Sequence, residues 1–198
     1  DPIGKDGTIA ILKGNLAPEG SVIKHSAVPQ EMQKAILKAK PFDSEEEAIA
    51  AVLNKTVKPG DAVIIRYEGP KGSGMPEMFY TTEAIASDPE LATTIALITD
   101  GRFSGATKGP AIGHVSPEAQ SGGAIALIEE GDLIEIDVAQ RILQIIGVNG
   151  VRKDLAEIDE ILKERKANWQ PRPDKYTKGI LSVYSKCAVS PMLGGYMA

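Results

Sequence analysis

The chain has 198 residues, of which 42% are hydrophobic and 25% are charged, with a formal net charge of −5 at pH 7. This composition is typical of a globular protein with one domain of ordinary size or two small ones. The acidic balance argues against a nucleic-acid-binding surface, and no apolar run approaches the roughly 18 residues of a membrane span. One cysteine and two histidines exclude a disulfide framework, a CxxC-type zinc site and an iron–sulfur site made by this chain alone.

The beginning of the chain has no signal-peptide pattern, and with a single cysteine a cytoplasmic setting is the default expectation. The sequence starts at Asp1 without a methionine. We therefore expect it to be a piece of a longer protein.

The first half of the chain predicts short strands and few helices. Ser44 and Glu47 have the spacing of a capping box, so a helix is expected from there to Asn54. The segment 32–39 is compatible with a helix but lacks a clear start signal. The other expected elements are strands over 8–12, 22–23 and 62–67, a glycine-rich loop over 69–74 and a short helix over 82–86.

The second half is also rich in strands. An apolar run over 95–98 predicts a buried strand, and a charged amphipathic helix is expected over 154–169, ended by Pro171 and Pro173. Three further strands are predicted over 124–128, 133–138 and 142–146. Because strands and helices do not alternate regularly, a barrel-like or sandwich α/β domain is favoured over a doubly wound sheet.

The segment after the run at 95–98 is the strongest candidate for chemistry. It reads TDGRFSG and places Asp100, Arg102 and Ser104 among glycines. A buried strand that opens into a glycine-rich polar turn commonly presents a reactive group. The hydroxyl of Ser104 needs an activating group, however, and nothing in the sequence shows that His114 lies near it. The pattern is not a G-x-S-x-G nucleophile elbow.

Other polar residues carry weaker signals. Glu77 follows a glycine-rich loop and could bind a hard cation such as magnesium, although a solvated acid is the simpler interpretation. Lys71 and Lys108 precede glycines and could meet an anionic substrate, but isolated loop lysines are mostly solvated. His114 is interpreted most simply as a hydrogen-bonded structural histidine, and Cys187 as a small buried apolar residue.

The order of several motifs resembles one known family, the dihydroxy-acid dehydratase / phosphogluconate dehydratase family, in its C-terminal domain. The resemblance extends from about Asp6 to Val148 and is less clear after Trp169. The motifs that carry it are Asn15-Leu16-Ala17-Pro18, Tyr67-Glu68-Gly69-Pro70-Lys71-Gly72, Gly74-Met75-Pro76-Glu77-Met78, Thr99-Asp100-Gly101-Arg102-Phe103-Ser104-Gly105 and Gly113-His114-Val115-Ser116-Pro117-Glu118-Ala119.

The resemblance implies a fold and a chemistry. Residues 1–198 would form a single strand-rich, barrel-like "swivelling" β/β/α domain at the C-terminal end of a longer enzyme, with segment 170–198 less certain. The enzyme would dehydrate a 2,3-dihydroxy acid to a 2-keto acid, using an iron–sulfur cluster and Mg²⁺ held mainly by its own N-terminal domain. Ser104 would be the base that removes the C2 proton, and Glu77 would be a magnesium ligand.

The resemblance leaves several points open. The loop Gly72-Ser73-Gly74 is shorter than the usual family form, and Ala111 stands where a cysteine is frequent. Branched-chain dihydroxy acids, phosphogluconate and unphosphorylated sugar acids all remain candidate substrates. The full-length protein would be a cytoplasmic homodimer that binds no nucleic acid and no membrane, and the isolated chain would be inactive. The alternative is a non-catalytic module that binds a small anion or a partner.

Overall fold

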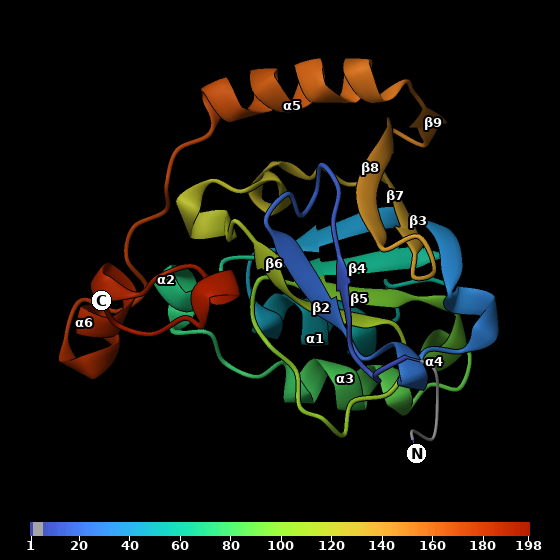
Figure 1. The fold of residues 1–198 in the computed structure, drawn as a ribbon, viewed down its shortest axis with the longest axis horizontal. Helices are drawn as coiled ribbons and strands as arrows, with labels where there is room; N and C mark the ends of the chain where they lie inside the picture. Colours follow the sequence, from blue (N-terminus) through green and yellow to red (C-terminus); the bar gives the residue numbers. More distant parts are fainter. Residues whose placement is uncertain (2–5) are drawn as a thin grey trace.

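A nine-stranded sheet curls into a half-barrel at the centre of the molecule (Figure 1). The computed structural model describes residues 1 and 6–198. The strands lie in the spatial order β1-β2-β6-β5-β4-β3-β7-β8-β9. They span β1 Ala10–Leu12, β2 Gly20–Ile23, β3 Lys34–Phe42, β4 Asp61–Ile65, β5 Ala96–Thr99, β6 Ala111–Ser116, β7 Leu133–Asp137, β8 Ile142–Val148 and β9 Val151–Arg152. The mixed, strand-rich α/β fold confirms the barrel-like prediction.

The middle of the sheet is parallel and its margins are antiparallel. Strands β3, β4, β5 and β6 run in one direction, whereas β1 with β2, β2 with β6, and β7 with its neighbours pair antiparallel. Strand β4 is buried on both faces: Ile64 packs into the larger core, while Val63 and Ile65 pack into a second core on the other side. This explains the continuous apolar run in its sequence, because a parallel strand covered on both faces has no polar side.

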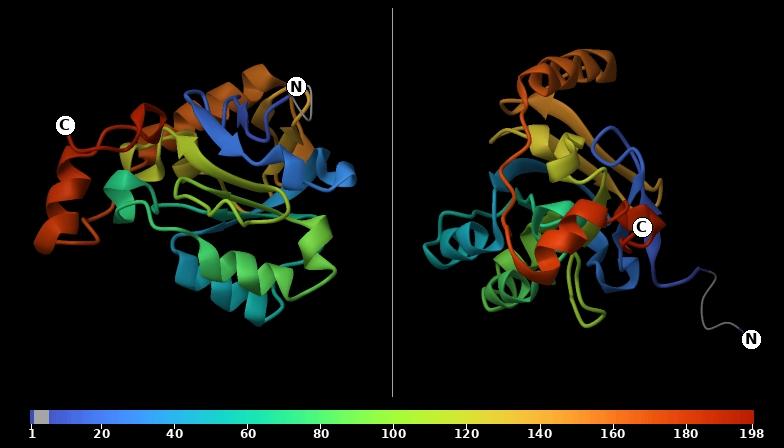
Figure 2. Two further views of the ribbon diagram at one scale, coloured as in Figure 1. Left: turned by 60° about the horizontal axis from the view of Figure 1, so that its bottom comes forward. Right: turned by 90° about the vertical axis from the view of Figure 1, so that its left-hand side faces the viewer.

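Six α-helices and several 3₁₀ turns complete the described part of the chain. The α-helices are α1 Glu45–Leu53, α2 Pro70–Ser73, α3 Phe79–Ala86, α4 Leu91–Thr94, α5 Leu155–Asn168 and α6 Gly179–Cys187. Helices α1, α3 and α4 lie below the sheet in Figure 1, and α5 lies across the opposite side. Figure 2 shows α6 projecting past the end of the sheet near α2. Among the described residues, every helix is too short or too polar to cross a membrane.

Helix α1 begins where its sequence predicts. The Oγ atom of Ser44 accepts a hydrogen bond from the amide of Glu47 at 3.2 Å, and the Glu47 carboxylate accepts one from the amide of Asp43 at 2.9 Å. The first bond satisfies an amide that the first turn of a helix leaves free, the second ties the residue before the N-cap to the helix, and acidic residues there favour the positive end of the helix dipole. The expected strands over 8–12, 22–23, 62–67, 95–98, 133–138 and 142–146, and the helices over 82–86 and 154–169, are likewise confirmed within a few residues.

Two predicted elements are wrong. The segment 32–39 forms most of β3 instead of a helix, because β3 pairs with β4 on one side and with β7 on the other. Its alternating Leu37 and Ala39 are buried against the sheet core. The segment 124–128 forms a 3₁₀ helix, Ala124–Leu127, instead of a strand. The carbonyl groups of Ala126, Leu127 and Ile128 accept hydrogen bonds from arginine side chains rather than from a neighbouring strand.

Two local interpretations also change. The glycine-rich stretch 69–74, expected as a loop, contains the single-turn helix α2. Cys187 is an exposed thiol at the end of α6, so its interpretation as a buried apolar residue is wrong.

Candidate functional site

Four polar loops meet at one edge of the sheet because β3, β4, β5 and β6 are parallel. The carboxyl ends of neighbouring parallel strands lie at the same edge, so the loops that follow them are brought side by side. Open α/β sheets bind ligands at this edge. An acidic residue stands close to the end of each strand: Asp43 after β3, Glu68 after β4, Asp100 after β5 and Glu118 after β6.

Asp100 ties three of these segments together. Its carboxylate is fully buried. One oxygen accepts the amide of Glu68 at 2.9 Å, and the other accepts the amides of Tyr67 at 3.2 Å and Ala119 at 2.8 Å. Two of these amides follow β4 and the third follows β6. Asp100 therefore fixes the start of the TDGRFSG turn relative to the loops on both sides.

Glu118 performs a similar task one loop further on. Its buried carboxylate accepts the amide of Lys71 at 2.9 Å and the amide of Gly72 at 3.1 Å. These amides belong to the first turn of α2, and amides of a first turn have no acceptor within their own helix. Glu118 thus holds α2, and α2 leads directly to the segment that carries Glu77.

Burial controls the protonation of both carboxyl groups. It raises the pKa of Asp100 to about 6, against the opposing effect of the backbone hydrogen bonds. It also raises the pKa of Glu118 to about 7, and the negative charge of Asp100 acts in the same direction. The two groups therefore titrate near neutral pH, because a buried carboxylate is costly to charge. The charge of Glu68 further disfavours a charged Asp100, and the charge of Asp100 further disfavours a charged Glu118.

Ser104 lies in a tight turn beside a cavity. Its Oγ atom accepts a hydrogen bond from the amide of Ala106 at 3.0 Å. The cavity has a volume of about 440 Å³. Ser104 and His114 both line it, together with Lys24 and apolar side chains that include Phe103. Among the described residues, no hydrogen bond joins Ser104 to His114, so the pair shares a cavity without forming a serine–histidine couple.

Glu77 is brought to the same edge by a short backbone pairing. It forms a parallel β-bridge with Arg102, and the flanking amide of Met78 donates to the Arg102 carbonyl at 2.9 Å. Arg102 stands two residues before Ser104, so the two predicted site residues lie on paired segments. The side chain of Glu77 is exposed and does not line the cavity of Ser104. Within residues 1 and 6–198, no three His, Cys, Asp or Glu side chains converge on a metal-sized site.

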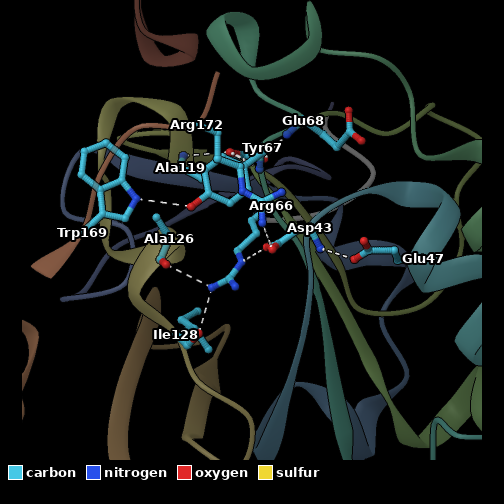
Figure 3. A network of polar contacts seen from close by, with 11 residues as sticks. Asp43, Glu47, Arg66, Tyr67, Glu68, Ala119, Ala126, Ile128, Trp169 and Arg172 are labelled. Carbon is cyan, nitrogen blue, oxygen red and sulfur yellow. Dashed lines mark hydrogen bonds and ion pairs between the residues drawn. The ribbon is translucent and has the colours of Figure 1, made fainter. Parts of the chain in front are cut away.

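The C-terminal segment packs against the same loops (Figure 3). The indole nitrogen of Trp169 donates to the hydroxyl of Tyr67 at 3.3 Å, and the guanidinium of Arg172 lies 4.4 Å from the centre of the Tyr67 ring while it pairs with Asp43. Arg66 pairs with Asp43 as well. Its guanidinium also donates to the carbonyls of Ala126 and Ile128 at 3.0 and 2.9 Å, which explains why that segment is not a strand.

Further along, the C-terminal segment contacts the loop after β4. Lys175 pairs with the buried Glu68 at 3.4 Å, and Ser73 donates to the same carboxylate. Gly74 has a φ of 86°, and a Cβ atom there would lie 2.9 Å from Leu181 of α6. The positive φ of the turn therefore favours glycine at this position, and the tip of the Leu181 side chain would have to move to admit a Cβ atom.

Three residues other than glycine adopt positive φ angles around the site: Tyr67 at 67°, Met75 at 58° and His114 at 57°. Such conformations are uncommon for side chains of this size and persist where the surroundings impose them. The amide of His114 donates to the carbonyl of Gly101 at 2.8 Å, which holds the start of the TDGRFSG turn against β6. His114 thus has a structural role through its backbone amide. Burial lowers the pKa of its imidazole.

The structure gathers some of the candidate residues and not others. Ser104 and His114 share a cavity, and Glu77 lies on the paired segment beside it, whereas Lys71 and Lys108 have exposed side chains. Sequence reasoning named Asp100 in the TDGRFSG segment without giving it a role, and it singled out none of Lys24, Glu68 and Glu118. Glu68, Asp100 and Glu118 could have been found from one signal, since each is an acidic residue soon after an apolar strand run.

The fold and the polar edge of the sheet place the protein in a class of mixed α/β domains, in which polar loops meet at the carboxyl ends of parallel strands. Comparison with known proteins narrows the class to one family. The family described as "Dihydroxy-acid/6-phosphogluconate dehydratase C-terminal" matches residues 1–195. The chain belongs to this family.

Individual relatives agree with this assignment. A dihydroxy-acid dehydratase of Agathobacter rectalis is 51% identical over 199 residues, and those of Moorella thermoacetica and Methanothrix thermoacetophila are 48% identical over 198 and 197 residues. Each alignment covers 99–100% of this chain but 34% of the relative. The chain therefore spans about a third of the length of these curated relatives.

Proposed function

We propose that this chain supplies the base and one magnesium ligand to a dihydroxy-acid dehydratase, with Ser104 as the base and Glu77 as the ligand. The observation that carries the proposal is the pairing of Glu77 with Arg102 beside the cavity of Ser104. It supports a metal ligand and a proton acceptor on adjacent segments. Family membership supports the reaction class.

The proposed reaction removes water from a 2,3-dihydroxy carboxylic acid. Ser104, in its deprotonated form, takes the proton from C2 as the C2–C3 double bond forms and the C3–O bond breaks. The proton gained by Ser104 balances the departing hydroxide, so that water is formed and the serine returns to its deprotonated form. The resulting enol becomes the 2-keto acid, and one molecule of water is released. Proton abstraction beside a carboxylate is difficult, and a hard cation bound to the substrate oxygens would stabilise the charge that develops.

This chain could supply some, but not all, of the ligands of a magnesium site. Glu77 presents an exposed carboxylate, which is an oxygen ligand that magnesium prefers, but magnesium needs near-octahedral coordination. The remaining ligands would come from substrate, water and an N-terminal domain of the full-length protein. The one cysteine, at the end of α6, cannot hold an iron–sulfur cluster alone, so the cluster would also be held by that domain. The full-length enzyme is proposed to be a cytoplasmic homodimer.

The cavity supports a small substrate with an alkyl side chain. Its lining includes the apolar side chains of Ile9, Val22 and Phe103 as well as polar groups such as Ser104 and Lys24. The relatives named above are dihydroxy-acid dehydratases, which favours a short 2,3-dihydroxy acid over a phosphorylated sugar acid.

A Ser104→Ala variant of the full-length protein tests the base. We expect kcat for 2-keto acid formation to fall by about 10²- to 10⁴-fold, the usual contribution of a positioned acid or base. Ser87→Ala is the matched control, because Ser87 is an exposed serine at the end of α3 that lines neither large cavity. Activity of the Ser104→Ala variant equal to that of the control would show that Ser104 is not the base.

A further inference from the structure

Lys24 makes an unexpected contact with the turn that carries Ser104. Its ammonium group donates to the carbonyl of Gly105 at 2.5 Å, across 81 residues of sequence. Lys24 follows the end of β2, whereas Gly105 follows β5. The lysine lines the cavity of Ser104 and also a neighbouring cavity of about 730 Å³, so it stands between them.

The turn has few other attachments to the rest of the molecule. Within it, the Oγ atom and the carbonyl of Ser104 accept the amides of Ala106 and Thr107 at 3.0 and 3.2 Å. Gly105 and Ala106 are exposed, and a Cβ atom at Gly105 would touch nothing within 4 Å. In the described part of the chain, the hydrogen bonds that link residues 104–109 to distant segments come from the stretch 24–27: Lys24 to Gly105, and the Ala27 carbonyl to the amide of Gly109 at 3.1 Å.

Lys24 also brings a positive charge to the cavity wall. Among the residues that line the cavity in the described chain, only Lys24 and His114 can become cations. Burial lowers the pKa of His114, and the nearby Arg102 lowers it further, so the imidazole is disfavoured as a cation. A cation that contacts the peptide next to Ser104 favours negative charge at that end of the cavity.

We infer that Lys24 is a positioning residue of this site: it fixes the Ser104 turn through the Gly105 carbonyl and supplies the positive charge that favours deprotonated Ser104. The inference rests on the proposed function for its catalytic part. Its structural part concerns only the turn, and can be measured in the 198-residue chain without any cofactor.

The first test measures the turn itself. Amide resonances of residues 104–107 are compared by NMR in the 198-residue chain and in the Lys24→Met, Lys24→Arg and Lys38→Met variants. Lys38 is an exposed lysine of β3 and serves as the matched control. We expect the Ala106 and Thr107 resonances to shift and broaden in Lys24→Met, to return toward their original positions in Lys24→Arg, and to be unchanged in Lys38→Met. Unchanged resonances in a folded Lys24→Met variant would overturn the inference.

The second test measures catalysis in the full-length enzyme. We expect Lys24→Met to lower kcat by about 10²-fold, since small displacements of a catalytic group have effects of this size, with KM changed much less. The acidic limb of the kcat–pH profile should move to higher pH, because the charge that favours deprotonated Ser104 is lost. Lys24→Arg should restore part of kcat and move that limb back.

Failure of the proposed function and failure of the inference about Lys24 would give different results. A full-length enzyme in which Ser104→Ala is as active as the original would contradict the proposed function, whereas the NMR comparison would still decide whether Lys24 holds the turn. If Ser104→Ala is inactive but Lys24→Met retains the original kcat and pH profile, the proposed function stands and the inference about Lys24 is wrong.

Discussion

At the scale of single residues, the site depends on buried carboxylates that bind backbone amides. Asp100 accepts three amides from two loops, and Glu118 accepts two from the start of α2. Neither side chain faces the cavity of Ser104. Their role is to hold the loops that carry Ser104 and Glu77 in one arrangement.

The Asp100→Asn variant should be destabilised. The asparagine amide group would face backbone amides that need an acceptor, so one or two of the three hydrogen bonds would be lost in a buried site. We expect the free energy of unfolding at pH 8 to fall by about 1–3 kcal/mol, the usual effect of leaving a buried polar group unsatisfied. Urea titration measures this, and Asp159→Asn on the exposed side of α5 is the control, with no change expected. Equal stability of the two variants would contradict the role given to Asp100.

The same carboxyl groups predict how stability depends on pH. Their pKa values are about 6 and about 7 in the folded chain, above the values of about 4 that acidic side chains have when unfolded. Between these values the folded state binds more protons, so the free energy of unfolding should fall as pH rises from about 4 to about 7. Lys71, Asp100 and Tyr184 are the charged or titratable groups around Glu118. A Glu118→Gln variant should therefore show a smaller change in unfolding free energy between pH 4 and pH 7, measured by urea titration at several pH values. An unchanged slope in this variant would contradict the account.

At the scale of secondary structure, sequence patterns predict most elements but not their partners. The capping box of α1 and the apolar run of β4 are local signals, and both elements form as expected. The segment 32–39 is helical by local preference but becomes β3, because pairing with two neighbouring strands outweighs that preference. Ser104 and Glu77 stand in recognisable motifs, whereas Lys24 acts through a contact between distant segments that no local pattern reveals.

Helix α5 is attached by an ion pair to the turn that precedes β7. Arg165 donates to the fully buried carboxylate of Asp132 at 2.5 and 3.1 Å and to the carbonyl of Leu127 at 3.0 Å. An Arg165→Met variant would leave the charge of Asp132 without its partner, and we expect it to cost about 3–5 kcal/mol of unfolding free energy. Lys163→Met is the control on the same helix, because Lys163 pairs with Glu160 in the solvent and should contribute little. A small, equal effect of both substitutions would contradict this attachment.

At the scale of the whole molecule, we propose that the chain presents part of a site. It spans about a third of its dihydroxy-acid dehydratase relatives. Its candidate base lines a cavity, and its candidate metal ligand points outward beside it. An exposed carboxylate on a fixed backbone pairing is suited to complete a metal site on another domain. The central claim is therefore that Glu77 reaches across a domain boundary.

Magnesium affinity of the full-length protein tests this claim most directly. It is measured by calorimetry for the original protein, for Glu77→Gln, and for Glu83→Gln, which changes an exposed glutamate of α3. We predict that Glu77→Gln weakens magnesium binding about tenfold or more, since losing a ligand should cost at least as much as losing a residue that orients one. Glu83→Gln should leave it unchanged, and the 198-residue chain alone should not bind magnesium tightly. Full affinity in the Glu77→Gln variant would contradict the account.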